Sequence, residues 1–185
     1  MKLYKNTIIL VVVLVLLGGA YYFISQNKSK DQSGENKTIT LFEMNKDKIS
    51  EININNATGD LIFKKQGDDW VIEGASDVKL DQVKIESMVW DVTFIEAEQV
   101  VEENAQDLDK FGLKTPGAAV TIRSADQSDA TLLIGDKLPS KTGYYVKMKD
   151  SQGVYTMASS KGETFLNGLD DYKDVTASSE ESENK

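Results

Sequence analysis

Apolar and polar residues alternate in short runs through the middle of the chain. Three such runs stand close together, at 49–55, 60–65 and 70–73. In the first, Ile52 and Ile54 alternate with Glu and Asn side chains. Strict alternation places successive side chains on opposite faces of a strand, and the Gly, Asp and Asn residues between the runs favour tight turns. The pattern predicts a three-stranded antiparallel meander.

A second set of alternating runs follows later in the chain. These runs cover 120–123, 130–134, 144–149 and 154–158, and they are separated by Gly, Ser, Asp and Pro residues. Such punctuation at short intervals is typical of strands joined by turns. We expect a second antiparallel meander from this half.

A helical period follows the first meander. Within residues 81–94, apolar side chains recur with the spacing i, i+3, i+4 and i+7, at Ile85, Met88, Val89 and Val92. This spacing places the four side chains on one face of a helix. We therefore expect this helix to bury that face against the strands.

A second helix is predicted near the C-terminus. Ser160 and Glu163 have the spacing of a capping box, which marks a helix start. The apolar face of this helix would consist of Phe165, Leu166, Leu169 and Tyr172. Between the meanders, residues 108–111 predict a short helical turn ended by Gly112.

The order of strands, helix, strands and helix predicts an α+β domain over residues 38–174, with antiparallel meanders packed against two helices. The same order suggests two related halves, 38–104 and 105–174. Their residue-level similarity is too weak to indicate a duplication.

The first 25 residues contain one long apolar run. No charged residue occurs at 7–24, and a helix of about 18 residues is about 27 Å long, close to the hydrocarbon thickness of a bilayer. Aromatic residues at 21–23 continue the run, which favours an uncleaved transmembrane helix over residues 1–25. The alternative is a signal peptide cleaved after Ala20, because Gly18 and Ala20 are small.

Charge around this run predicts how the chain is oriented. Lys2 and Lys5 precede it, and positive charge is typical of the cytoplasmic side of a span. We expect a single-pass protein of the bacterial cell membrane, with a cytoplasmic N-terminus and an extracytoplasmic domain. The polar segment 26–37 predicts a flexible tether, and the acidic segment 175–185 predicts a disordered tail.

Composition excludes several classes of function. The chain has 30 acidic and 21 basic residues, a net charge of −9, and neither Cys nor His. A negative surface repels nucleic-acid phosphates. Without thiolate or imidazole, Cys- or His-based nucleophiles and zinc sites are excluded. We expect no metal, no cofactor and no disulfide, and a monomeric domain held together by its core.

Four segments resemble one known family when taken in order after the apolar run. They are GDDWVI at 67–72, LDKFGLKTP at 108–116, LIGDK at 133–137 and GYYVK at 143–147. Together they resemble the bacterial membrane-anchored proteins catalogued as domain of unknown function 4340. The resemblance implies the location and the fold. That family has no settled activity, although some members look like neighbours or fused partners of gliding-type ABC transport components.

The loop predicted at 135–143 is the candidate binding site. Asp136 and Lys137 put opposite charges at its entrance, and of Tyr144 and Tyr145 one must face each side of the sheet. An exposed tyrosine beside a loop on a rigid sheet is well suited to a protein contact. The alternative is that this segment only forms a turn.

Other candidates are weaker. Carboxylates crowd one region, at Glu96, Glu98, Glu102, Glu103, Asp107 and Asp109. Two of them could cleave a glycosidic bond at a suitable separation, but their spacing selects no pair and forms no calcium loop. Trp70 and Trp90 could stack on sugars, although packing in the core is the preferred interpretation for both.

The sequence therefore favours a non-enzymatic, membrane-tethered interaction module of the bacterial cell envelope, with a protein partner and an accessory role in a transporter or envelope-assembly complex. The alternative is a carboxylate-dependent hydrolase or a small-ligand binder acting on envelope polysaccharide. A cleft with facing carboxylates, or exposed aromatic rings, would favour the alternative. A closed domain with a flat apolar patch would favour the interaction module.

Overall fold

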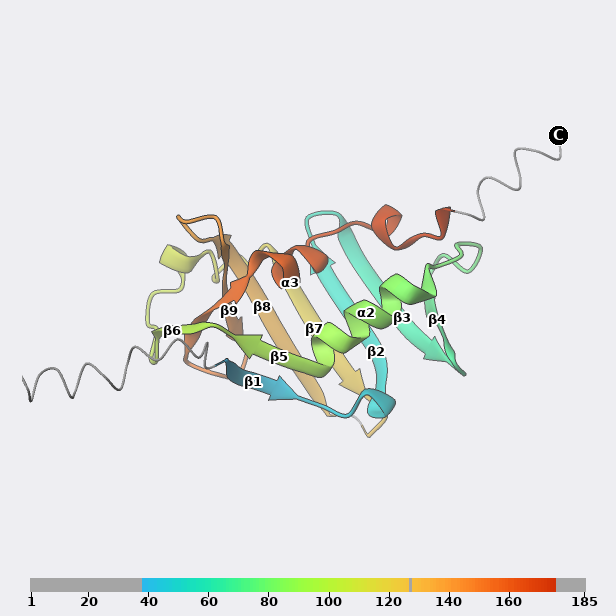
Figure 1. The fold of residues 1–185 in the computed structure, drawn as a ribbon, viewed down its shortest axis with the longest axis horizontal. Helices are drawn as coiled ribbons and strands as arrows, with labels where there is room; N and C mark the ends of the chain where they lie inside the picture. Colours follow the sequence, from blue (N-terminus) through green and yellow to red (C-terminus); the bar gives the residue numbers. More distant parts are fainter. Residues whose placement is uncertain (1–37, 127, 176–185) are drawn as a thin grey trace, which may run out of the picture. The chain divides into compact units, whose positions relative to one another are not determined.

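The computed structural model describes residues 38–126 and 128–175. Within them, eight antiparallel strands form one sheet in the order β4-β3-β2-β7-β8-β9-β10-β6, and β1 and β5 form a separate two-stranded ribbon (Figure 1). The strands are β1 (Ile39–Glu43), β2 (Ile49–Asn56), β3 (Gly59–Gln66), β4 (Asp69–Ile72), β5 (Phe94–Ala97), β6 (Gln99–Glu102), β7 (Ala118–Ser124), β8 (Asp129–Lys137), β9 (Gly143–Met148) and β10 (Val154–Ala158). The helices are α2 (Gln82–Thr93) and α3 (Ser159–Thr164), with 3-10 turns η1 (Lys46–Lys48), η2 (Asp109–Phe111) and η3 (Leu169–Tyr172). The α+β prediction with antiparallel sheet is confirmed.

Both predicted meanders form, and they join into one sheet. Strand β2 of the first pairs with β7 of the second, with Ile52 opposite Ile122 and Ile54 opposite Val120. All four side chains are fully buried on the same face. The two halves suggested by the sequence therefore share a single sheet and core.

Helix α2 forms where its period predicts. The Asp81 carboxylate caps it by accepting hydrogen bonds from the backbone N–H groups of Val83 and Lys84, at 3.1 and 3.2 Å. The predicted stripe is buried in the core: Ile85, Met88, Val89 and Val92. Burial of each such side chain contributes about 1.5–3 kcal/mol. We call the face of the sheet under α2 the inner face and the opposite side the outer face.

The same layer contains the β1–β5 ribbon, which the sequence pattern did not predict (Figure 1). Strand β5 starts directly after α2, and Ile95 and Ala97 are its buried residues. After Glu98, whose N–H donates to Thr156 at 2.9 Å, the chain continues as β6 on the edge of the large sheet. Strands β5 and β6 have four residues each, which is too few for an alternating pattern to be recognised beside the strong helical period of α2.

The single C-terminal helix predicted from Ser160 to Tyr172 is wrong. It is divided into α3 and η3, because the Asn167-Gly168 pair between them disfavours helix. Ala158 occupies the N-cap of α3, with no side-chain hydrogen bond, so the expected capping box does not form.

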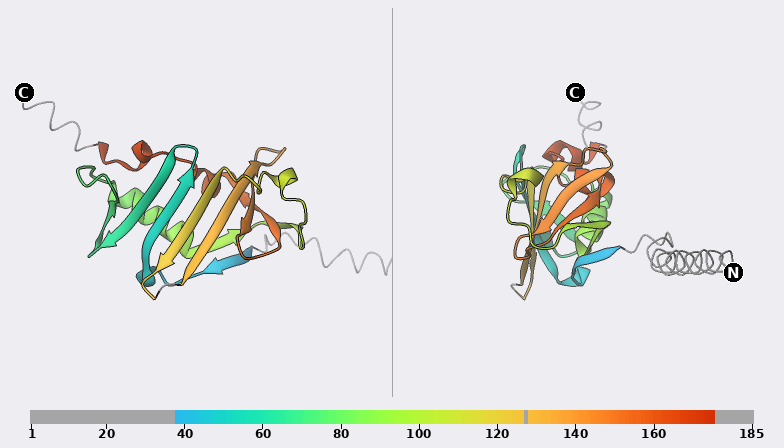
Figure 2. Two further views of the ribbon diagram at one scale, coloured as in Figure 1. Left: turned by 180° about the vertical axis from the view of Figure 1, so that it is seen from behind. Right: turned by 90° about the vertical axis from the view of Figure 1, so that its left-hand side faces the viewer.

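A second, smaller core covers one end of the outer face. The predicted short turn appears as η2 and ends at Gly112, which has φ 65°. Phe111 and Leu113 from this segment pack on Val154 of β10. Elsewhere, along β2, β3 and β7, no helix or strand of the described residues covers the outer face (Figure 2).

No helix in the part of the chain that the structure describes is long and apolar enough to cross a membrane. The predicted span (1–25), the predicted tether (26–37) and all but the first residue of the predicted tail lie outside the described residues.

Candidate functional site

The two tyrosines of the predicted site face opposite sides of the sheet, as expected, but neither is an exposed contact residue. Tyr144 is on the inner face, 8% exposed, and packs closely on Gly162 of α3. Tyr145 is on the outer face, where its ring lies 5.0 Å from that of Phe111, in contact with the small core. The expectation of an exposed outward tyrosine is therefore corrected, because the η2 segment covers that position.

The charged residues of the predicted site lie within a strand instead of a long loop. Strand β8 continues to Lys137 and β9 begins at Gly143, so the connection is shorter than the predicted 135–143. The Lys137 amine donates to the Glu163 carboxylate at 2.9 Å, and this bond raises the lysine pKa. Asp136 lies against Gly112, where an added Cβ would collide with it. A binding role for these residues stays a prediction, and their visible contacts hold β8 and β9 to η2 and α3.

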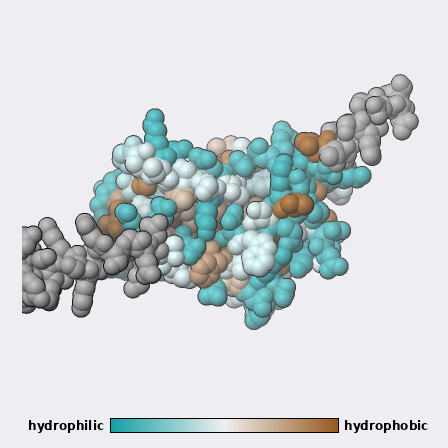
Figure 3. Space-filling model, viewed as in Figure 1, coloured by the Kyte–Doolittle hydropathy of each residue, from teal (hydrophilic) through white to brown (hydrophobic). Residues whose placement is uncertain are grey.

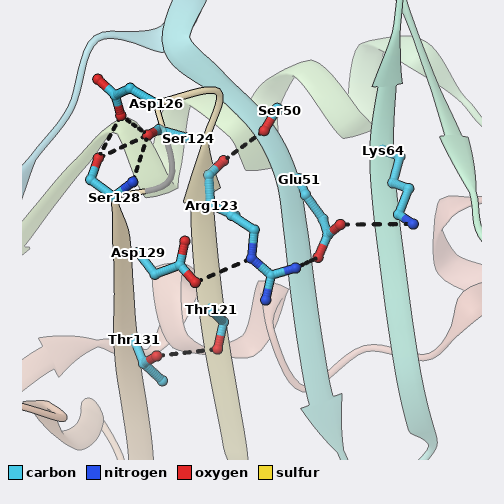
Figure 4. A network of polar contacts seen from close by, with 10 residues as sticks. All are labelled: Ser50, Glu51, Lys64, Thr121, Arg123, Ser124, Asp126, Ser128, Asp129 and Thr131. Carbon is cyan, nitrogen blue, oxygen red and sulfur yellow. Dashed lines mark hydrogen bonds and ion pairs between the residues drawn. The ribbon is translucent and has the colours of Figure 1, made fainter.

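A row of alternating charges crosses the outer face from β8 to β3 (Figure 4). The Arg123 guanidinium donates to Glu51 at 2.5 Å and to Asp129 at 3.1 Å. The Lys64 amine lies 3.8 Å from Glu51 and 2.7 Å from Glu73. Each charge in the row has an opposite partner within the domain. Exposed pairs of this kind add little stability, and the row leaves no charge that calls for a ligand.

At the end of β7, hydroxyl groups surround a carboxylate (Figure 4). Asp126 accepts hydrogen bonds from the hydroxyls of Ser124 and Ser128, and these bonds, with a weaker one from Lys48, hold its pKa well below the usual range. The Lys48 amine lies 3.3 Å from the Asp126 carboxylate. These bonds stabilise the turn between β7 and β8.

The outward side of α2 carries large apolar side chains in water. Val83 is 80% exposed, Trp90 is 61% exposed, and Phe94, at the start of β5, is 36% exposed. Val83 and Trp90 are two helical turns apart and so lie on one side of α2. We call Val83, Trp90 and Phe94 the α2 stripe. Figure 3 shows the molecule from the side of α2, with apolar patches among hydrophilic surface.

The exposure of Trp90 corrects the prediction that both tryptophans are core residues. Trp70 is 2% exposed and does lie in the core. The sequence held a signal for the difference, because Trp90 lies one position off the buried i, i+3, i+4, i+7 pattern and must point away from it.

One face of the Trp90 ring is held by a cation. The Lys46 amine, from η1, lies 5.0 Å from the centre of the ring and also pairs with Glu86, one helical turn before Trp90. Exposed cation–π contacts are worth about 0.5–1 kcal/mol. The contact orients the indole on the surface, where Trp90 stays 61% exposed.

Three carboxylates lie next to the stripe or to Lys46, and among the described residues none of them forms a hydrogen bond or a salt bridge through its side chain. Glu43 lies opposite Phe94 in the β1–β5 ribbon, Asp47 follows Lys46 in η1, and Asp91 follows Trp90. Burial raises the pKa of Asp91, while the charge of Lys161 acts in the opposite direction. The stripe therefore has an acidic border.

Two surface hollows of the described residues are large enough to admit a small molecule. One, of about 440 Å³, lies beside β4 and has Glu73 as its only carboxylate; the other, of about 190 Å³, lies between α2 and the C-terminal segment and has only Asp171. Glycoside hydrolysis needs two carboxyl groups on either side of the bond. Neither hollow supplies them, and residues 38–126 and 128–175 hold no cluster of three acidic groups arranged for a metal ion.

The acidic region noted in the sequence is spread over the surface in ion pairs. Glu102 pairs with Lys110 at 2.6 Å, and Asp109 pairs with Lys114 at 2.6 Å. Glu96 lies 3.3 Å from the amine of Lys161. This arrangement favours a solvated surface over a catalytic pair.

Comparison with known proteins gives one finding. The sequence model of the family described as Domain of unknown function (DUF4340) matches residues 70–184, a range that includes α2, every strand from β5 to β10 and all but the first residue of β4. No curated protein and no solved structure matches the chain.

Proposed function

The chain belongs to the family Domain of unknown function (DUF4340), and from this premise we propose that it is a non-enzymatic, membrane-tethered interaction module on the outer side of a bacterial cell membrane. In this proposal residues 1–25 anchor the chain, and the α2 stripe contacts a protein partner. The partner would be a component of a transporter or envelope-assembly complex, which the domain serves as an accessory.

The observation that carries the proposal is the exposure of Trp90, 61%, between two other exposed apolar side chains. Tryptophan is the residue type most enriched at the energetic centres of protein interfaces. The ring is already oriented by Lys46, so little conformational entropy would be lost on binding. Contacts with a partner would remove this apolar surface from water.

One observation also favours the second candidate, a polysaccharide binder, because an exposed indole ring can stack on a sugar. Support for this candidate is weaker. Lys46 covers one side of the ring, and neither hollow described above includes Trp90. A hydrolase receives no support from the arrangement of carboxylates.

The test uses the full-length chain in its own membrane. Partners are captured by crosslinking in cells and quantified after purification for the wild type, Trp90→Ala and the matched control Trp90→Phe. We expect Trp90→Phe to retain the captured partner, because an aromatic ring remains, and Trp90→Ala to lose more than tenfold. Equal capture by wild type and Trp90→Ala would refute the role of the stripe.

Two further measurements separate the alternatives. Soluble fragments of wall polysaccharide should leave the fluorescence of the wild type unchanged; quenching that Trp90→Phe abolishes would support the sugar binder instead. A reporter active only outside the cytoplasm, fused after Lys185, should be active while the protein stays in salt-washed membranes. Release of the domain with a new N-terminus at Tyr21 would overturn the anchor.

A further inference from the structure

We infer that the partner of the α2 stripe presents a short apolar helix or segment flanked by Lys or Arg side chains. This inference rests on the proposed function and specifies the chemistry of the partner.

The length of the stripe sets the size of the apolar part. Val83 and Trp90 are two turns apart, about 10.5 Å at 1.5 Å per residue, and Phe94 extends the surface into β5. An amphipathic helix with apolar residues at i, i+3 or i+4, and i+7 covers the same length. Two heptads of such a helix are sufficient.

The charge of the border sets the sign of the flanking residues. Among the described residues, the lysines of η1, α2 and α3 already have partners within the domain. Lys46 pairs with Glu86 and the Trp90 ring, Lys48 with Asp126 at 3.3 Å, and Lys161 with Glu96 at 3.3 Å. Lys84 donates to the Asp171 carbonyl at 3.0 Å.

Among the described residues, the carboxylates of Glu43 and Asp47 form no ion pair, and Asp91 interacts only with the charge of Lys161, which is already paired with Glu96. The charge left over around the stripe is therefore negative. Cationic side chains of a partner would be attracted, and most strongly at Asp91, which is half-buried and poorly solvated.

Charge also argues against other occupants of the same surface. A second copy of the chain would bring the two acidic borders together, and a membrane with anionic lipids would face the same repulsion. A protein segment that combines apolar and basic side chains satisfies both features of the surface.

The experiment uses the full-length chain in nanodiscs of zwitterionic lipid and a synthetic helical peptide of two heptads, with Leu on one face and Lys at the borders of that face. Binding is measured by titration calorimetry at low and at high salt. We expect binding that weakens at high salt. A triple variant, Glu43→Gln, Asp47→Asn and Asp91→Asn, should weaken it more than tenfold at low salt.

The matched control neutralises three exposed carboxylates elsewhere, Asp68→Asn, Glu103→Gln and Asp150→Asn, and changes the net charge equally. It should bind like the wild type. Equal loss in both triple variants would reduce the effect to overall charge and overturn the inference, as would equal binding of wild type and the first triple variant.

Three other outcomes would also overturn it: tighter binding of a peptide with Glu in place of Lys, binding to anionic vesicles that Trp90→Ala abolishes, or a stripe-dependent dimer in sedimentation. If the charge variant binds normally while Trp90→Ala still loses the crosslinked partner, the inference fails and the proposed function stands. If Trp90→Ala captures the partner normally, the proposed function itself fails.

Discussion

The outer face of the sheet and the outward side of α2 are both exposed, but they differ in how far the domain completes its own interactions. On the outer face, Arg123 binds Glu51 and Asp129, and Lys64 binds Glu51 and Glu73. On α2, large apolar side chains are exposed to water, and the carboxylates beside them form no salt bridge among the described residues. This difference is the reason why we propose α2, and not the outer face, as the binding surface.

The largest expected effect separates the two tryptophans. Trp70→Ala should lower the free energy of unfolding by about 3–5 kcal/mol, because it leaves a cavity in the core. Trp90→Ala removes exposed surface and should change it by less than about 1 kcal/mol. Denaturant unfolding of the two variants measures both values.

Trp70→Phe is the control for the core position. The buried indole N–H of Trp70 has no hydrogen-bond partner among the described residues, so losing it should cost far less than Trp70→Ala. Comparable destabilisation by Trp70→Ala and Trp90→Ala would mean that Trp90 is a structural residue.

The next effect concerns the free edge of the sheet at β4. The Gln82 side chain accepts a hydrogen bond from the backbone N–H of Trp70 and donates one to the backbone carbonyl of Trp70, both at 3.0 Å. It therefore takes the place of a neighbouring strand. Gln82→Ala should cost about 1–2 kcal/mol and expose an edge that can pair with other chains. Thermal unfolding and light scattering would detect the two changes; Gln82→Glu, which keeps only the acceptor, should be intermediate.

A smaller effect is expected on the outer face. Arg123→Ala should lower the melting temperature slightly, since its ion pairs are exposed, and should leave partner capture unchanged. Capture that falls as far as with Trp90→Ala would remove the difference between the two surfaces.

The smallest effect comes from Asp91. Burial raises its pKa in the folded state, so the folded protein binds the proton more tightly than the unfolded chain does. The stabilisation that the protonated Asp91 carboxyl gives the fold is present below the pKa of Asp91 in the unfolded chain. It is lost as the pH rises through the pKa of Asp91 in the folded protein. Asp91→Asn should therefore slightly stabilise the domain at pH 7 and make no difference at pH 3, as followed by denaturant unfolding.

Sequence reasoning recovered what repeats along the chain. The period-2 runs predicted β2, β3, β4 and β7–β10, and the 3.6-residue period predicted α2 with its buried stripe. It missed β1, β5 and β6, which are too short to show a clear period, and it joined α3 to η3 across Gly168. Local pattern could not show that β2 pairs with β7, because that pairing depends on tertiary packing.

The candidate site shows the same limit. Asp136 and Lys137 were predicted in a loop but lie in β8, whereas Tyr144 and Tyr145 lie in a strand as predicted. The segment that covers Tyr145 comes from elsewhere in the chain. Trp90 could have been placed outside the core from its helical position. The carboxylates near Trp90 could not have been predicted from the sequence. Glu43 comes close to this surface through the pairing of β1 with β5, and Asp47 through the contact of η1 with Trp90.

The difference between the two surfaces is tested most directly by site-specific photocrosslinking in cells. One crosslinking residue replaces Ser87, between Val83 and Trp90 on α2, and another replaces Asn55, exposed on the outer face. The proposal predicts a discrete crosslinked protein from position 87 that disappears in Trp90→Ala, and none from position 55. A crosslink from position 55 alone, or from both positions regardless of Trp90, would contradict it.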